Sequence, residues 1–155
     1  MSRLYRIAIT GALLAISVVA LMGGCSISGP PDPKAAVIAM FGAMEKDDKA
    51  ALAHLLDLPA LMNTYSEDYA LQTDKPRVFT SPQQILEDLT GDGLTKVRWF
   101  SMQRIVNEVL VTGESATVEV TFVDKAKSIG YRTKFGLHIV NEKWKIYSFK
   151  TEQGI

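Results

Sequence analysis

The sequence predicts an α+β protein in which N-terminal helices pack on a four-stranded antiparallel sheet. Three observations predict this class. Apolar residues recur at helical spacing over residues 33–89, the period changes to two from residue 96 onward, and turn signals separate the alternating segments. Helices that are followed by such a meander are expected to cover one face of the sheet and to leave the other face nearer to solvent.

The N-terminal half of the folded part is expected to form three or four helices. The first begins at residues 32–33, where an aspartate N-cap precedes a proline, and the second begins at residues 47–48, a pair of aspartates. A short third helix is expected over residues 59–65. The fourth begins at residues 81–84, a Ser-Pro-Gln-Gln capping box. The polar segment 66–80 is expected to be a loop, which could serve as a lid or as a partner surface.

The C-terminal half is expected to form the four strands. Residues 116–123, 131–140 and 144–147 alternate between apolar and polar side chains, and turn signals lie between them. Residues 99–111 must supply the first strand, although their alternation is irregular. A β-bulge near Asn107, or a break into two strands, accounts for that irregularity.

The N-terminus has the pattern of an export signal. Arg3 and Arg6 precede the apolar segment 7–22, and small residues lead to Cys25, the only cysteine of the chain. Residues 21–25, Leu-Met-Gly-Gly-Cys, resemble the lipobox of bacterial lipoproteins, with a methionine where that family prefers leucine. The resemblance implies a lipoprotein signal peptide that is cut before the cysteine and fatty-acyl chains, such as palmitate, on Cys25. An uncleaved membrane anchor with an incidental cysteine is the alternative.

This interpretation divides the chain into a signal peptide (1–24), the lipidated cysteine with a short tether (25–32), one domain (33–150) and a C-terminal tail (151–155). The six residues that follow the cysteine span at most about 20 Å, so the domain is expected to lie close to the bilayer. Ser26 is compatible with export to the periplasmic side of the outer membrane if the source is Gram-negative.

The charge balance of the mature chain argues against two classes of partner. The signal holds two arginines and no acid, so the mature chain has 17 − 2 = 15 Lys and Arg against 17 Asp and Glu. A near-neutral chain argues against a nucleic-acid partner, for which a basic face is expected. It also argues against a polybasic contact with the membrane surface, so the acyl chains on Cys25 must provide the membrane attachment.

The order of elements resembles the NTF2-like, or cystatin-like, superfamily, and its local sequence resembles bacterial lipoproteins of the DUF4878 type. The residues that carry the likeness are Glu45-Lys46-Asp47, the hairpin entry 113–118 and the terminal strand 142–146. The resemblance covers roughly residues 33–150. It implies a curved sheet that wraps a pocket closed by the helices. Some members are isomerases or related enzymes with Asp, His or Tyr in the cone, and others bind ligands or dimerise.

Little in the sequence points to catalysis, a metal or a cofactor. His54 is expected to be an exposed helix residue, and His138 is expected on the solvent side of the third strand. The acidic pairs at 47–48, 67–68 and 87–88 are interpreted as caps and solvated faces, since neighbouring side chains face different ways. The inward positions of the last three strands hold neither Asp nor Glu, which argues against an isomerase-like site.

Aromatic side chains in the C-terminal half are expected to form most of the core, and some of them to line an apolar pocket: Trp99, Phe122, Tyr131, Phe135 and Trp144. The sequence therefore predicts a non-catalytic, lipid-anchored envelope protein that binds a small apolar ligand, a protein partner or a second copy of itself. One alternative is a small enzyme that uses His138 with Tyr131 or Asp124. The other is a scaffold subunit of an envelope or secretion assembly.

Overall fold

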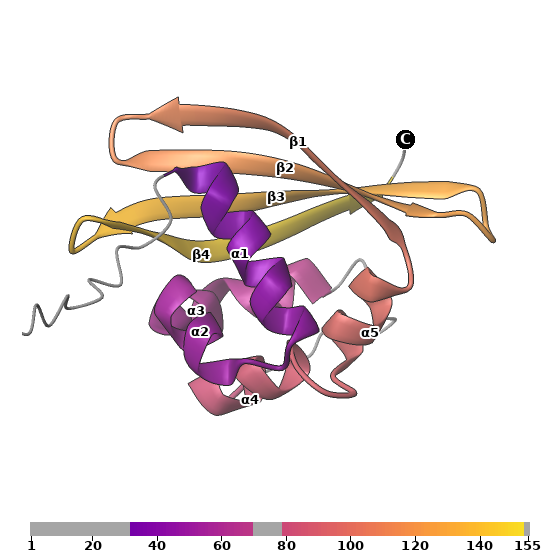
Figure 1. Ribbon diagram of the computed structural model, residues 1–155, viewed down its shortest axis with the longest axis horizontal. Helices are drawn as coiled ribbons and strands as arrows, with labels where there is room; N and C mark the ends of the chain where they lie inside the picture. Colours follow the sequence, from indigo (N-terminus) through magenta and orange to yellow (C-terminus); the bar gives the residue numbers. More distant parts are fainter. Residues whose placement is uncertain (1–31, 70–78, 154–155) are drawn as a thin grey trace, which may run out of the picture.

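The computed structural model describes residues 32–69 and 79–153, which form helices followed by an antiparallel sheet (Figure 1). The described elements are α1 (Pro33–Glu45), α2 (Lys49–Leu55), α3 (Leu58–Tyr69), α4 (Pro82–Asp88), α5 (Leu94–Phe100), β1 (Gln103–Thr112), β2 (Ser115–Asp124), β3 (Ile129–Val140) and β4 (Lys143–Gln153). The strands follow the order β1-β2-β3-β4, and the helices gather on one face of the curved sheet. The expected α+β class is confirmed.

The predicted helix starts are confirmed at α1 and α2. Asp32 accepts a hydrogen bond from the Ala35 N–H at 2.7 Å, and Asp48 accepts one from the Ala51 N–H at 2.9 Å. Each carboxylate thereby satisfies a backbone donor that has no partner within its helix. The capping box of α4 is different, because Gln84 Oε1 accepts from the Thr80 N–H at 2.8 Å and the Ser81 side chain makes no capping bond.

Two helical predictions need correction. α3 continues to Tyr69, past the end expected at residue 65, so it includes the start of the predicted loop 66–80. The second correction is α5, because its residues 99–100 were expected to begin the first strand. Thr95 and Trp99 lie one turn apart and are the two buried residues of α5, and because Thr95 is polar the sequence shows no helical apolar pattern there.

Several predictions lie outside the described residues. They are Cys25 with its acyl chains, the signal peptide over 1–24, the tether except for its last residue, and the part of the predicted loop over 70–78. Among the described helices, none is both long and apolar enough to cross a membrane.

The sheet follows the predicted alternation, with one bulge where the sequence is irregular. The β1–β2 register shifts between Val106 and Val109, which confirms the irregularity expected near Asn107. The predicted inward residues of β2 are all buried, namely Ala116, Val118, Val120 and Phe122. β4 continues to Gln153, beyond the domain end expected at residue 150. Its Thr151 is buried and lies 2.8 Å from the Thr133 hydroxyl of β3, so the expected tail begins inside the sheet.

Candidate functional site

The helix-covered face of the sheet is filled by packed aromatic rings. Phe135 lies 5.6 Å from Trp99 and 5.3 Å from Phe149 between ring centroids, and Trp99 lies 5.3 Å from Phe122. Phe41 of α1 contacts three of these rings at 5.8–6.1 Å. Such spacings are those of aromatic side chains in direct contact. Trp99, Phe122 and Phe135, three of the residues considered for a pocket lining, therefore form the core that the sequence also predicts.

The other two aromatic candidates lie at the margin of this cluster. Tyr131 lies under the Arg98 guanidinium, whose carbon is 5.2 Å from the ring centroid. Trp144 is half-buried on β4 opposite Ile139, near the β3–β4 turn. Tyr131 is nevertheless a buried member of the core and lies opposite Phe122 of β2, and Trp144 packs against the core from its margin, so four of the five candidates are core residues.

Three surface pockets formed by described residues lie elsewhere. One of about 400 Å³ lies between Phe79, α4 and α5, and one of about 480 Å³ lies at the β2–β3 turn. A third, of about 140 Å³, is lined in part by Tyr131, Arg98 and Asp124. None of these three is lined by the packed rings of Trp99, Phe122 and Phe135, and the one at the β2–β3 turn includes the apolar side chains of Val123 and Ile129.

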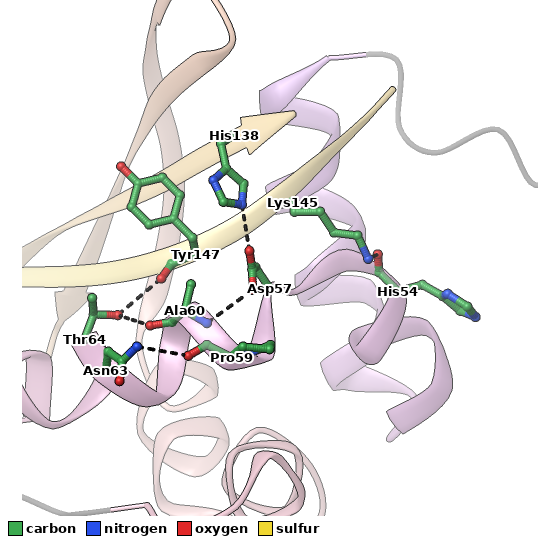
Figure 2. A network of polar contacts seen from close by, with 9 residues as sticks. All are labelled: His54, Asp57, Pro59, Ala60, Asn63, Thr64, His138, Lys145 and Tyr147. Carbon is green, nitrogen blue, oxygen red and sulfur yellow. Dashed lines mark hydrogen bonds and ion pairs between the residues drawn. The ribbon is translucent and has the colours of Figure 1, made fainter. Parts of the chain in front are cut away.

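A polar cluster forms where the α2–α3 junction meets β4 (Figure 2). Leu56 forms a parallel bridge with Ile146, and the Asp57 N–H donates to the Ile146 carbonyl at 2.8 Å. Two helical turns further on, Thr64 Oγ1 donates to the Tyr147 carbonyl at 3.2 Å. These bonds cover part of the β4 edge, and they fix Asp57 beside the open face of the sheet.

Asp57 has two roles, one for each carboxylate oxygen. Its Oδ1 accepts from the Ala60 N–H at 3.2 Å, and its carbonyl accepts from the Leu61 N–H at 2.9 Å, so Asp57 caps α3. Its Oδ2 lies 2.8 Å from Nε2 of His138 on β3. The side chains of His138 and Asp57 are 33% and 23% exposed, so the pair is only partly shielded from water.

The ring of Tyr147 lies beside the ring of His138, and Gly136 leaves room for the tyrosine ring because it has no side chain. Tyr147 lies two residues after Lys145, the β4 residue that pairs with His138, and so shares its face, while the register shift between Gly136 and Leu137 places Ser148 opposite the glycine. A Cβ at Gly136 would lie 2.9 Å from Tyr147 Cζ and 2.4 Å from Ser148 Oγ. The Tyr147 ring instead covers the glycine and lies 4.9 Å from the His138 ring, tilted by 35° (Figure 2).

Lys145 supplies a positive charge on the other side of Asp57. Its ammonium donates to the His54 carbonyl at the end of α2 (Figure 2). Partial burial lowers the pKa of Lys145 from its usual 10.5, and the negative charge of Asp57 opposes that change. The cluster therefore holds one carboxylate near an imidazole and an ammonium.

This geometry can orient an imidazole, and it also fastens the helices to the sheet. A carboxylate that holds one ring nitrogen leaves the other available for proton transfer, as in general-base sites. The same contacts join α2, α3, β3 and β4. Among the described residues, no three His, Cys, Asp or Glu side chains approach closely enough to hold a metal ion.

The sequence placed His138 correctly on the face away from the helices, and His54 is exposed as expected. The partner of His138 is Asp57, however, and neither Tyr131 nor Asp124 bonds to it in the hydrogen bonds we find among the described residues. Asp57 was missed because it lies 81 residues from His138. The only local signal was that of an aspartate N-cap two residues before a proline, which predicts a helix start and not a histidine partner.

The acidic pair at residues 87–88 needs a correction as well. Asp88 is only 4% exposed, although both residues were interpreted as caps or solvated positions. Its Oδ2 accepts from Thr95 Oγ1 at 2.5 Å, which joins α4 to α5. A Cβ at Gly93 would lie 2.2 Å from the Asp88 carbonyl oxygen, so only glycine permits this close approach of the two helices.

No protein-family model matches the sequence, and no curated protein matches it either. Several solved structures are similar in outline. An NTF2-like protein of unknown function from Silicibacter pomeroyi is 14% identical, with a TM-score of 0.47 over 77% of this chain and 91% of that one. One from Shewanella baltica is 12% identical, with a TM-score of 0.47 over 77% and 89% of the two chains. A DUF4783 family protein from Bacteroides ovatus is 12% identical, with a TM-score of 0.44 over 76% and 94%.

Proposed function

We propose that this protein is a non-catalytic lipoprotein of the cell envelope, of the DUF4878 type within the NTF2-like superfamily, whose domain binds a protein partner. The observation that carries the choice of a protein over an apolar ligand is the aromatic packing of the helix-covered face. Where Trp99, Phe122 and Phe135 contact one another, an apolar ligand would have to displace core side chains. An envelope partner, including a second copy of the chain, can instead use the open face of the sheet.

The open face has the mixed polarity of a protein-binding surface. It presents His138 and Tyr147 beside charged and amide groups of β1–β3. Arg132 Nε lies 3.1 Å from Glu119 Oε1, and Asn107 Nδ2 donates to Thr121 Oγ1 at 2.6 Å. No described helix covers this face (Figure 1). Within this face Arg132 is ion-paired with Glu119 and Asn107 is hydrogen-bonded to Thr121, and such a mixture suits a moderately polar interface.

The anchor is tested first. We expect Cys25→Ser to abolish acyl labelling and to leave the precursor uncleaved, because the thiol is the acceptor of the diacylglyceryl group in the lipoproteins that the N-terminus resembles. Radiolabelled fatty acid and the mass of the purified protein report both steps. Normal labelling of the variant would disprove the assignment and, with it, the membrane location on the periplasmic side.

The partner is tested by cross-linking the acylated protein in membranes and purifying it. Stable envelope subunits in the product support the scaffold version, and a cross-linked pair of identical chains supports the homodimer. An uptake of apolar dyes or lipids by the purified domain, with no partner captured, would contradict the proposal and favour the ligand version.

A small enzyme of the isomerase or hydrolase type is the second candidate, and the Asp57–His138 pair favours it. The pair has the distance and orientation of a carboxylate that positions an imidazole. This candidate requires turnover that is lost in His138→Gln and kept in His54→Gln, since His54 is exposed on α2. Equal residual turnover in the two variants would exclude it.

A further inference from the structure

The β1–β2 and β3–β4 turns lie at the end of the sheet toward which α1 begins (Figure 1), and the first turn of α1 contacts β1 through Lys34, which donates to the Asn107 carbonyl at 3.3 Å. The β1–β2 turn and the β3–β4 turn share this end, and the Ile139 N–H donates to the Glu114 carbonyl at 3.0 Å, which joins them. Figure 1 shows α1 beginning at the same end, whereas α5 lies toward the opposite end. We call this region, residues 110–115 and 139–144, the hairpin end.

The hairpin end exposes large apolar side chains. Leu110 is 69% exposed, Val111 is 52% exposed and Ile139 is 38% exposed. Ile139 is paired with the half-buried Trp144. Single exposed apolar residues are ordinary, but a group of them at one end of a small domain indicates a contact surface.

These side chains point to both faces of the sheet. Val111 pairs with the buried Ala116 and therefore shares the helix-covered side, whereas Leu110 pairs with Thr117 on the open side. An interface formed by one flat face of the sheet would cover only one of the two. A surface that meets the sheet end-on would cover both, and a lipid bilayer is such a surface.

The position of α1 supports the same occupant. The inference rests on the proposed anchor at Cys25, which lies seven residues before Asp32, the N-cap of α1. Seven residues span at most about 25 Å. The acyl chains would thus keep the start of α1, and the turns at the same end of the sheet, close to the headgroups.

The charges at this end give no net attraction to anionic lipid. The exposed groups have both signs, Lys34 and Lys143 against Asp32, Glu114 and Glu142, with no excess of positive charge. Attraction to anionic lipid needs clustered Lys and Arg. Tryptophan, in contrast, is enriched at the membrane–water interface, and Trp144 lies at the right place for it.

We propose that the hairpin end rests on the lipid bilayer and inserts Leu110, Val111 and Ile139 into its interface. The domain then stands on the membrane in one orientation, with α5 and the β2–β3 turn away from it. Contact depends on apolar side chains and not on anionic headgroups, so it should be the same with zwitterionic lipid.

The test uses the full acylated protein, in which the sulfur of Cys25 is blocked and a new cysteine is the only free thiol. Val111→Cys and Val97→Cys form a matched pair, because both valines are 52% exposed and lie at opposite ends. Each is labelled with an environment-sensitive dye and placed in phosphatidylcholine vesicles that carry a spin label near the headgroups. We expect the dye at 111 to lose about half of its emission or more, since interfacial side chains enter about 5–10 Å into the boundary region. The dye at 97 should be unchanged.

A second variant tests the cause. Leu110→Asp should restore most of the emission of the dye at 111, whereas Leu94→Asp, which changes a leucine that is 54% exposed on α5, should not. Equal quenching at 111 and 97 overturns the proposal. So does a dye at 111 that is unquenched in vesicles but shielded in native envelopes, because a protein would then cover this end.

The mass of the labelled protein distinguishes a failure of the proposed anchor at Cys25 from a failure of the proposed docking surface. If Cys25 carries acyl chains and the dye at 111 is not quenched, the docking surface is wrong and the anchor stands. If the mass shows no acyl chain, the proposed anchor fails and the docking inference fails with it.

Discussion

Phe135 and His138 lie three residues apart on β3, yet they belong to opposite environments. Phe135 faces the helices, is fully buried and contacts the rings of Trp99 and Phe149. His138 faces the open side and bonds to Asp57. The alternation of a single strand thus separates the packed core from the partly exposed polar face of the sheet.

The two environments also differ in how they join the helices to the sheet. Apolar contact joins α1 and α5 to the sheet through Phe41 and Trp99. The α2–α3 junction is joined to β4 by the buried Leu56 and, in addition, by specific hydrogen bonds from Asp57 and Thr64. Burial of a large aromatic side chain is worth more than a partly exposed polar contact, so substitutions in the two regions should differ in cost.

The largest effect is expected in the core. Phe135→Ala should lower the free energy of unfolding by about 3–5 kcal/mol, since it removes a fully buried ring and leaves a cavity. Urea denaturation followed by circular dichroism measures it. Ile105→Ala on β1 is the control, because that side chain is 45% exposed and its loss should change stability by less than about 0.5 kcal/mol. An equal loss of unfolding free energy in the two variants would contradict the packed aromatic core described above.

An intermediate effect is expected at Gly136, where the open face is tightly packed. Gly136→Ala should cost about 1–3 kcal/mol, because the new methyl group would lie 2.4 Å from Ser148 Oγ and 2.9 Å from Tyr147 Cζ. The same substitution in a Tyr147→Ala background should cost less, since one of the two clashes is gone. Thermal unfolding of the four proteins measures the difference. An unchanged cost in that background would show that Tyr147 does not cover the glycine.

The sequence predicts regions whose signals are local and periodic. The caps Asp32 and Asp48, the inward residues of β2 and the bulge near Asn107 all follow from neighbouring residues. Prediction from the sequence fails for α5, where Thr95 and Trp99 are the only buried side chains of a seven-residue helix. It also fails for Asp57 and His138, because their meeting depends on how the α2–α3 junction packs against β4, and no local pattern encodes that contact.

The smallest effect is expected for the Asp57–His138 pair, and it decides whether this contact matters to the fold. Asp57→Asn keeps an oxygen that can cap α3 and removes the negative charge, and His138→Gln removes the imidazole. The double-mutant cycle should give a coupling energy of about 0.5–1.5 kcal/mol, because the pair is partly exposed. His54→Gln, in an exposed position on α2, should show no coupling with Asp57→Asn. A coupling near zero for His138 would leave the helix cap as the only structural role of Asp57, and the pair would then be free to serve binding on the open face of the sheet.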